Sequence, residues 1–351
     1  MALSWRSAPP VLLGISQAGA NLTLASTAWM VSGLTPSPLL NSLLPALGAL
    51  PLMLQLRRTP KGYSLQLLAV ILLIGISLAA GIKTLHPMPL VLGCFAAVLL
   101  FGLGQEMSSL PLQRRLLSQP GCSMPRLRSG QDLGALVGNL LAALLFPAIR
   151  QFVPALVLLL PMAGLAASPS NKATPMEPSC GAQRIPLDAR CMLQGLVMGG
   201  LFALLALWVR EVDGGKCFDF AMVLTAYGLG RIGVGLIPAL HRSLGYLLMA
   251  ALLLISQAGL PPWLAVVLFV PMGALAARTD VALVEQLTHL GDAPLCWQVM
   301  VRSAAIGGLV GSIGLGLICQ VSSLSMAVPL VVTGFLVLAL SQLGSPGAIS
   351  R

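Results

Sequence analysis

The sequence feature that most constrains the fold is a long stretch without any charged side chain. From Ser7 to Leu56 the chain carries no Asp, Glu, Lys or Arg over 50 residues, and comparable stretches recur toward its end. Of all 351 residues only 9% are charged, against about 25% in soluble domains. A helix needs about 20 apolar residues to cross a bilayer core about 30 Å thick. The sequence therefore predicts an all-α, polytopic membrane protein and excludes a soluble globular one.

Counting uncharged stretches of that length gives about twelve transmembrane helices. The longest stretch divides at Thr35-Pro36-Ser37-Pro38, because proline lacks the amide hydrogen that a helix interior needs. The predicted spans lie in Ser7–Leu56 (two spans), Gly62–Ile82, Thr84–Gln105, Leu133–Phe146, Gln151–Ala167, Cys191–Val209, Cys217–Leu240, Ser243–Ala277 (two spans) and Ser303–Ser350 (two spans).

The distribution of Lys and Arg predicts the orientation of these spans. An even number of spans places both termini on one side, and 14 of the 20 Lys and Arg residues fall on that side. Four lie in the opposite loops, while Arg231 and Arg302 lie inside spans. Because cytoplasmic loops are rich in Lys and Arg, we expect both termini in the cytoplasm and the protein in the inner (plasma) membrane. The net charge of +10 then reports orientation, and no nucleic-acid partner is expected.

An internal repeat indicates how the spans are organised. Gly134–Asn139 (GALVGN) recurs 173 positions later as Gly307–Ser312 (GGLVGS). Leu56–Tyr63, which contains Arg58 and Gly62-Tyr63, is matched by Leu240–Tyr246, which contains Arg242 and Gly245-Tyr246. Two matches at about half the chain length predict two six-helix halves in the same orientation. The predicted units are an N-terminal six-helix bundle (residues 1–168), a cytoplasmic linker (169–190) and a C-terminal six-helix bundle (191–351).

This arrangement of two parallel six-helix repeats with a long central loop resembles the major facilitator superfamily of transporters over nearly the whole chain. The first hairpin is similar to the branch that carries siderophore and drug efflux proteins, through Ser16–Gly19, Ala28-Trp29, Leu34–Pro38 and Leu50-Pro51. The resemblance implies alternating access of the two halves around a central cavity lined by spans 1, 4, 7 and 10.

The sequence also departs from the pattern of that superfamily. The signature after span 2 is reduced to Arg57–Gly62 and lacks its aspartate, and Val91–Gly104 lacks the span 4 arginine of proton-coupled members. Asn139 stands where the span 5 motif has proline. These losses and the short chain leave a second interpretation open, a non-transporting relative that serves as a membrane scaffold or assembly factor.

Span 1 is the most polar helix, and its polar side chains share one face. At 100° per residue, the side chains of Ser16, Gln17, Asn21, Thr23 and Thr27 fall within about 160°. With the resemblance, this face predicts substrate contacts at Gln17, Asn21, Thr27 and, on span 7, Gln194. The alternative is that these side chains only bond neighbouring helices. Spans 4 and 10 are nearly free of polar residues, which favours a lipophilic or amphipathic substrate.

Charges inside spans need partners, because each costs about 2.5 to 3.5 kcal/mol at the centre of a bilayer. Candidate acids near the depth of Arg231 and Arg302 are Glu106, Asp132, Asp280 and Glu285. The resemblance places spans 5 and 8 side by side, which predicts a bridge from Arg231 to Asp132 and a weaker one from Arg302 to Asp280. These residues would latch a cytoplasmic gate, or else form static packing pairs or extend their charged ends to the membrane interface.

The remaining motifs indicate helix packing, and none of them indicates metal binding or catalysis. Gly134, Gly138, Gly307 and Gly311 have the spacing that lets helices approach closely. The seven cysteines and three histidines show no metal-ligand spacing, so neither a metal nor a cofactor is expected, and without a nucleophile and base pair we expect no enzyme. No carboxylate lies near the middle of a span, which leaves a coupling proton, another ion or uniport open.

The sequence thus predicts a secondary transporter that exports a lipophilic or amphipathic small molecule across the inner membrane by alternating access.

Overall fold

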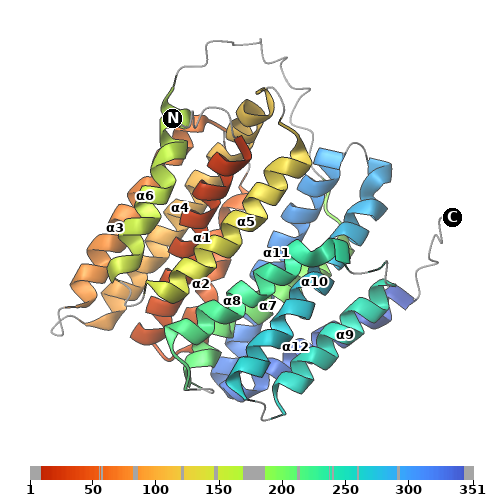
Figure 1. Ribbon diagram of the computed structural model, residues 1–351. Helices are drawn as coiled ribbons and strands as arrows, with labels where there is room; N and C mark the ends of the chain where they lie inside the picture. The colour runs from red at the N-terminus through yellow and green to blue at the C-terminus, as the bar shows by residue number, and fades with distance from the viewer. Residues whose placement is uncertain are drawn as a thin grey trace.

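The computed structural model describes residues 9–54, 56, 58–81, 86–119, 122–145, 149–168, 186–211, 214–236, 238, 241–258, 261–290 and 293–343. Its described part contains twelve α-helices and no strand, so the all-α prediction is confirmed (Figure 1). The helices are α1 (Pro9–Leu34), α2 (Pro38–Ala49), α3 (Tyr63–Ala80), α4 (Pro87–Leu117), α5 (Met124–Leu144), α6 (Ile149–Ala167), α7 (Ala189–Glu211), α8 (Cys217–Ile232), α9 (Arg242–Ser256), α10 (Pro262–Gln286), α11 (Ala293–Val321) and α12 (Ala327–Leu343).

Seven of the described helices are long and apolar enough to cross a membrane, and α2, α6 and α9 are shorter apolar helices. The two others, α1 and α5, each carry several polar side chains and pack against each other. Several helices extend past the predicted spans. At 31 residues, α4 is about 46 Å long, because a helix that leaves the apolar core no longer needs apolar residues and can continue through Glu106 to Leu117.

The local sequence explains where these helices begin. The prolines that divide the first stretch separate α1 from α2, and the Ser37 side chain caps α2 by accepting from the Leu40 amide at 3.3 Å. At the start of α7, the Asp188 carboxylate accepts from the amides of Arg190 and Cys191, both at 2.9 Å. Most of the predicted linker, residues 169–185, lies outside the described residues. The membrane side where α6 ends and α7 begins is called the linker face below.

The glycines of the repeated motif bring one pair of helices in each half of the chain into backbone contact. A β-carbon at Gly134 or Gly138 of α5 would overlap backbone carbonyl oxygens of α1. A β-carbon at Gly307 or Gly311 of α11 would overlap carbonyl oxygens of α7 in the same way. The two segments that match in sequence therefore make equivalent contacts in the structure, α5 on α1 and α11 on α7.

The first six and last six helices meet along two antiparallel pairs, α2 with α11 and α5 with α8 (Figure 1). In the first pair, the Ser37 hydroxyl donates to the Gln320 side chain at 2.7 Å. In the second, the Asn139 amide donates to the carbonyl of Leu224 at 3.3 Å. One apolar core lies wholly among α1–α6, and a larger one joins second-half helices to buried residues of α1, α5 and α6, Trp29 among them. The two halves are thus in contact through polar and apolar groups.

Two neighbouring glycines of α11 test the importance of backbone contact. Gly311→Ala places a methyl group against the Leu196 carbonyl of α7, and overpacking of this kind costs about 1 to 3 kcal/mol. Gly314→Ala meets nothing within 4 Å, so it should be neutral or stabilise the helix by up to about 1 kcal/mol. Thermal unfolding of the purified protein in detergent measures both. Equal stability of the two variants would contradict backbone contact between α7 and α11.

Candidate functional site

Four helices of the second half contribute to one buried polar cluster, here called the four-helix network. The Asp280 carboxylate of α10 accepts from the Arg231 guanidinium of α8 at 3.0 Å and from the Gln194 side-chain amide of α7 at 2.5 Å. The Gln194 oxygen accepts from the Tyr246 hydroxyl of α9 at 2.6 Å. These four side chains lie toward the linker face, within the last two turns of α8 and α10 and the first two turns of α7 and α9.

Burial explains why these side chains are so completely bonded to one another. Tyr246 and Gln194 are 1% and 5% exposed, and the Asp280 side chain is 14% exposed. A charge with so little water around it must be paired and hydrogen-bonded. Both carboxylate oxygens of Asp280 and both ends of the Gln194 amide have partners. The network therefore holds the linker-face ends of α7, α8, α9 and α10 together.

The predicted bridges from Arg231 to Asp132 and from Arg302 to Asp280 are wrong. Arg231 pairs with Asp280 because α8 and α10 cross in backbone contact, where Gly230 lies against the carbonyl of Val270 and Gly273 against that of Tyr227. This crossing places the two side chains within the same half.

The other members of the two predicted bridges, Asp132 and Arg302, have different surroundings. Asp132 of α5 remains within the electrostatic field of Arg231 and Arg128. The Nε atom of Arg302 is buried without a hydrogen-bond partner among the described residues.

The first half holds an ion pair in the corresponding place. Glu106 of α4 pairs with Arg58, which follows α2, at 3.6 Å. The backbone amide of Thr59 donates to the Met107 carbonyl at 2.9 Å and holds the same loop on α4. Glu106 and Asp280 stand 174 positions apart, close to the repeat offset. In each half, an acid on the fourth helix thus pairs with an arginine at or after the end of the second helix, so both ion pairs lie within a half and not between halves.

Two arginine–tryptophan contacts do join the halves, one at each membrane face, and we call them the two clasps. On the face opposite the linker, Arg210 of α7 lies over the ring of Trp29 of α1 at 4.0 Å and donates to the Trp29 carbonyl at 3.0 Å. On the linker face, Arg128 of α5 lies 3.2 Å over the ring of Trp297 of α11. A cation over an aromatic ring contributes about 0.5 to 2 kcal/mol, which is enough to hold a contact and weak enough to release it.

Sequence reasoning missed both clasps. It counted Arg128 and Arg210 among the charges at the ends of spans and used Trp29 only as part of a hairpin pattern. The signal was present in each case as an arginine and a tryptophan at the same membrane depth in opposite halves.

The residues predicted to contact substrate lie in different surroundings. Gln17 and Asn21 are half-buried one turn apart on α1, and the Gln17 amide donates to the Asn21 oxygen at 3.4 Å. Thr27 is fully buried, and its hydroxyl donates to the Thr23 carbonyl at 2.7 Å within its own helix. Gln194 belongs to the four-helix network. Of the four residues predicted to contact substrate, Gln17 and Asn21 are therefore the two whose polar groups are not fully used within the described part of the protein.

Other groups extend this polar region of α1 across the boundary between the halves. A β-carbon at Gly138 would lie 3.0 Å from the Asn21 β-carbon, and the next residue, Asn139, reaches α8. On α8, Tyr227 packs edge-on against Phe202 of α7, with ring centroids 4.8 Å apart. The side chains of Asn21 and Asn139 thus lie where α1, α5 and α8 approach one another, while the two aromatic rings lie between α7 and α8. Within the described residues, no group of three or more His, Cys, Asp or Glu side chains could hold a metal ion.

The chain was compared with known proteins by sequence and by structure. No family model and no curated protein sequence matches the chain. Among solved structures, the nucleoside transporter NupG superposes with a TM-score of 0.67 at 11% identity, over 97% of this chain and 98% of that one.

Two further transporters have the same arrangement of helices. The human organic anion transporter MFSD10 (TETRAN) has a TM-score of 0.55 at 14% identity over 97% and 100% of the two chains. A bacterial homologue of the human lysosomal transporter Spinster, solved inward-facing and unoccupied, has a TM-score of 0.58 at 12% identity over 97% and 94%. The chain is therefore a polytopic membrane protein with the fold of the major facilitator superfamily.

Charge swaps test the partner of Arg231. The single variants Arg231→Asp and Asp280→Arg should each lower the yield of folded protein, because breaking a buried ion pair costs about 3 to 5 kcal/mol. The double variant Arg231→Asp/Asp280→Arg should restore much of that yield, whereas Arg231→Asp/Asp132→Arg should not. The measurement is the monodisperse peak in fluorescence-detected size-exclusion chromatography. Rescue by the exchange with Asp132 instead would contradict the observed pairing.

Proposed function

We propose that the protein is a secondary transporter that works by alternating access, with α1–α6 and α7–α12 as its two moving units. The observation that carries the proposal is the pair of clasps, which join the halves at opposite membrane faces. The structural similarity to three transporters over nearly the whole chain supports it. In such a cycle, one clasp opens while the other stays closed.

The chemistry of the contacts suits this motion. A guanidinium that leaves a tryptophan ring is rehydrated by water at the membrane face, so opening a clasp leaves no buried charge without a partner. The ion pairs Arg58–Glu106 and Arg231–Asp280 lie within the halves and are kept when the halves separate. Each half can therefore rotate as a rigid unit, and the contacts between α2 and α11 and between α5 and α8 are kept during the rotation.

For the substrate we propose an amphipathic small molecule, bound where the halves meet. Gln17 and Asn21 would hydrogen-bond its polar part, and the rings of Phe202 and Tyr227 would contact its apolar part. The similar proteins include a nucleoside transporter and an organic anion transporter.

We further propose export across the inner membrane, with both termini cytoplasmic. The concentration of arginine and lysine at the linker face supports the orientation, and the resemblance of the first hairpin to efflux proteins supports the direction. Asp132, which lies on α5 at the contact with α8 and within the electrostatic field of Arg231, would carry any coupling to protons.

Flux into proteoliposomes tests the proposal. The panel contains nucleosides, amphipathic organic anions, lipophilic cations and siderophore-like compounds, each measured with and without a pH gradient. We expect flux of at least one amphipathic compound, with Gln17→Ala/Asn21→Ala at least tenfold slower, because about two ligand hydrogen bonds of roughly 1 kcal/mol each are lost. Thr27→Val is the matched control on the same helix, since its hydroxyl bonds only its own backbone.

Two results would contradict the proposal. Full flux in the Gln17→Ala/Asn21→Ala variant would remove these residues from the substrate site. No flux from folded protein that retains a bound partner protein would favour a membrane scaffold instead.

A further inference from the structure

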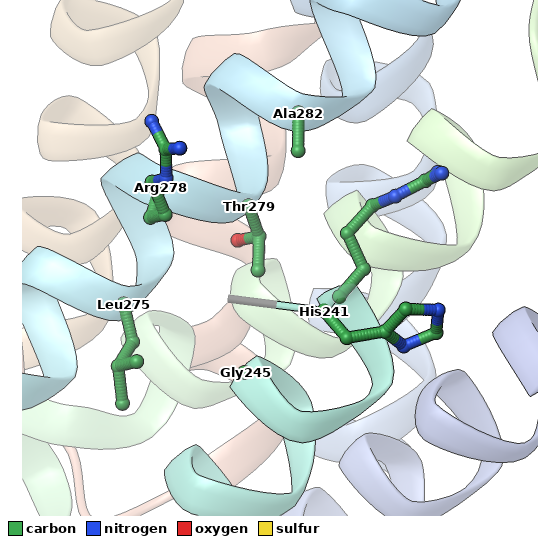
Figure 2. Close-up of a pocket in the computed structure, with 7 residues that line it drawn as sticks. His241, Gly245, Leu275, Arg278, Thr279 and Ala282 are labelled. Atoms are coloured by element: carbon green, nitrogen blue, oxygen red, sulfur yellow. The ribbon is translucent and has the colours of Figure 1, made fainter. Parts of the chain in front are cut away.

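We propose that the cleft between the linker-face ends of α9 and α10 binds the head group of an anionic phospholipid. The cleft is lined by His241, Arg242 and Gly245 of the α9 end and by Leu275, Arg278 and Thr279 of α10. Figure 2 shows His241 and Gly245 on one side and Arg278 on the other, with the Thr279 side chain between the two helices. This site lies outside the boundary between the halves, so it does not rest on the proposed function.

The charges around the cleft favour an anion. Three of its lining side chains are Arg or His and none is acidic. Arg278 has neither a hydrogen bond nor an ion pair within the described part of the chain. Arg242 uses one nitrogen to donate to the Gln342 side chain at 3.2 Å, and its electrostatic neighbours are Tyr246, Arg190 and Glu285. A phosphate would give Arg278 the counter-charge that the protein does not supply.

The depth and direction of Arg278 place the cleft in the lipid interface. Trp263, Val267, Pro271 and Arg278 follow one another on one side of α10, at helical spacings of four, four and seven residues. Trp263 and Val267 are 67% and 49% exposed, so this side faces lipid. The 15 residues from Trp263 to Arg278 span about 22 Å. A tryptophan at one interface and an arginine reaching the other are typical of a lipid-facing helix.

The surroundings of the cleft favour a lipid over a free phosphate. Next to it on α9, Leu244, Leu247 and Leu248 are about 40% exposed and offer an apolar surface for an acyl chain. Gly245 lets α9 approach α10 closely beside the cleft, because a β-carbon there would lie 3.1 Å from the Thr279 methyl group. Basic clefts between helix ends at a charged leaflet are where anionic head groups bind.

Native mass spectrometry and thermal unfolding test the inference on the full-length protein in detergent. Delipidated protein is titrated with phosphatidylglycerol, with phosphatidylcholine and with inorganic phosphate. We expect bound phosphatidylglycerol and a raised melting temperature with that lipid alone. The variant Arg242→Gln/Arg278→Gln should bind it about 10- to 30-fold more weakly. Arg114→Gln, an exposed arginine at the linker-face end of α4, should bind it like the wild type.

Several outcomes would overturn the site. These are equal binding of phosphatidylcholine, an equal loss in Arg114→Gln, or the same stabilisation by inorganic phosphate. Should the double variant fail to fold, the preference of the wild type for phosphatidylglycerol over phosphatidylcholine, and its loss in Arg278→Gln alone, decide the question. A transport assay with no flux would leave this result unaffected, which separates it from the proposed function.

Discussion

Backbone contact between helices is the constraint on which this structure depends. In a bilayer, apolar side chains gain nothing by leaving lipid for another helix, so helices associate where their backbones can approach closely. Gly134 and Gly138 provide such a surface between α5 and α1, and Gly307 and Gly311 provide it between α11 and α7. Helix α1 is thereby fixed at its centre, with Gln17 and Asn21 held at defined positions.

Polar contacts then divide into those inside a half and those between halves. The pairs Arg58–Glu106 and Arg231–Asp280 each join two elements of one half. The two clasps use an arginine from one half and a tryptophan from the other, with the roles reversed between the membrane faces. Buried ion pairs are costly to break, while cation–π contacts are modest. The molecule thus has stronger contacts within its halves than at the two faces where the halves would separate.

The sequence could predict the helices and their repetition, because a bilayer forces charge out of about 20 residues at a time. Thr35-Pro36-Ser37-Pro38 marked the first break correctly, and both copies of the glycine motif lie at equivalent contacts. The ends of α4 and α5 could not be read from hydropathy, since both helices continue into water. The partner of Arg231 was missed because it depends on how α8 crosses α10 at Gly230 and Gly273. The positions of charged residues along the sequence do not show how two helices cross. The clasps were missed for the same reason, since they join residues far apart in the sequence.

The most direct test is a pair of distances measured by double electron–electron resonance in lipid nanodiscs. One pair of spin labels at positions 119 and 289 spans the halves on the linker face, and the other, at positions 86 and 257, spans them on the opposite face. The account predicts two populations in which one distance lengthens as the other shortens. Trp29→Ala should favour opening opposite the linker, and Trp297→Ala should favour opening at the linker face. A single fixed distance at both faces, unchanged by either substitution, would contradict alternating access.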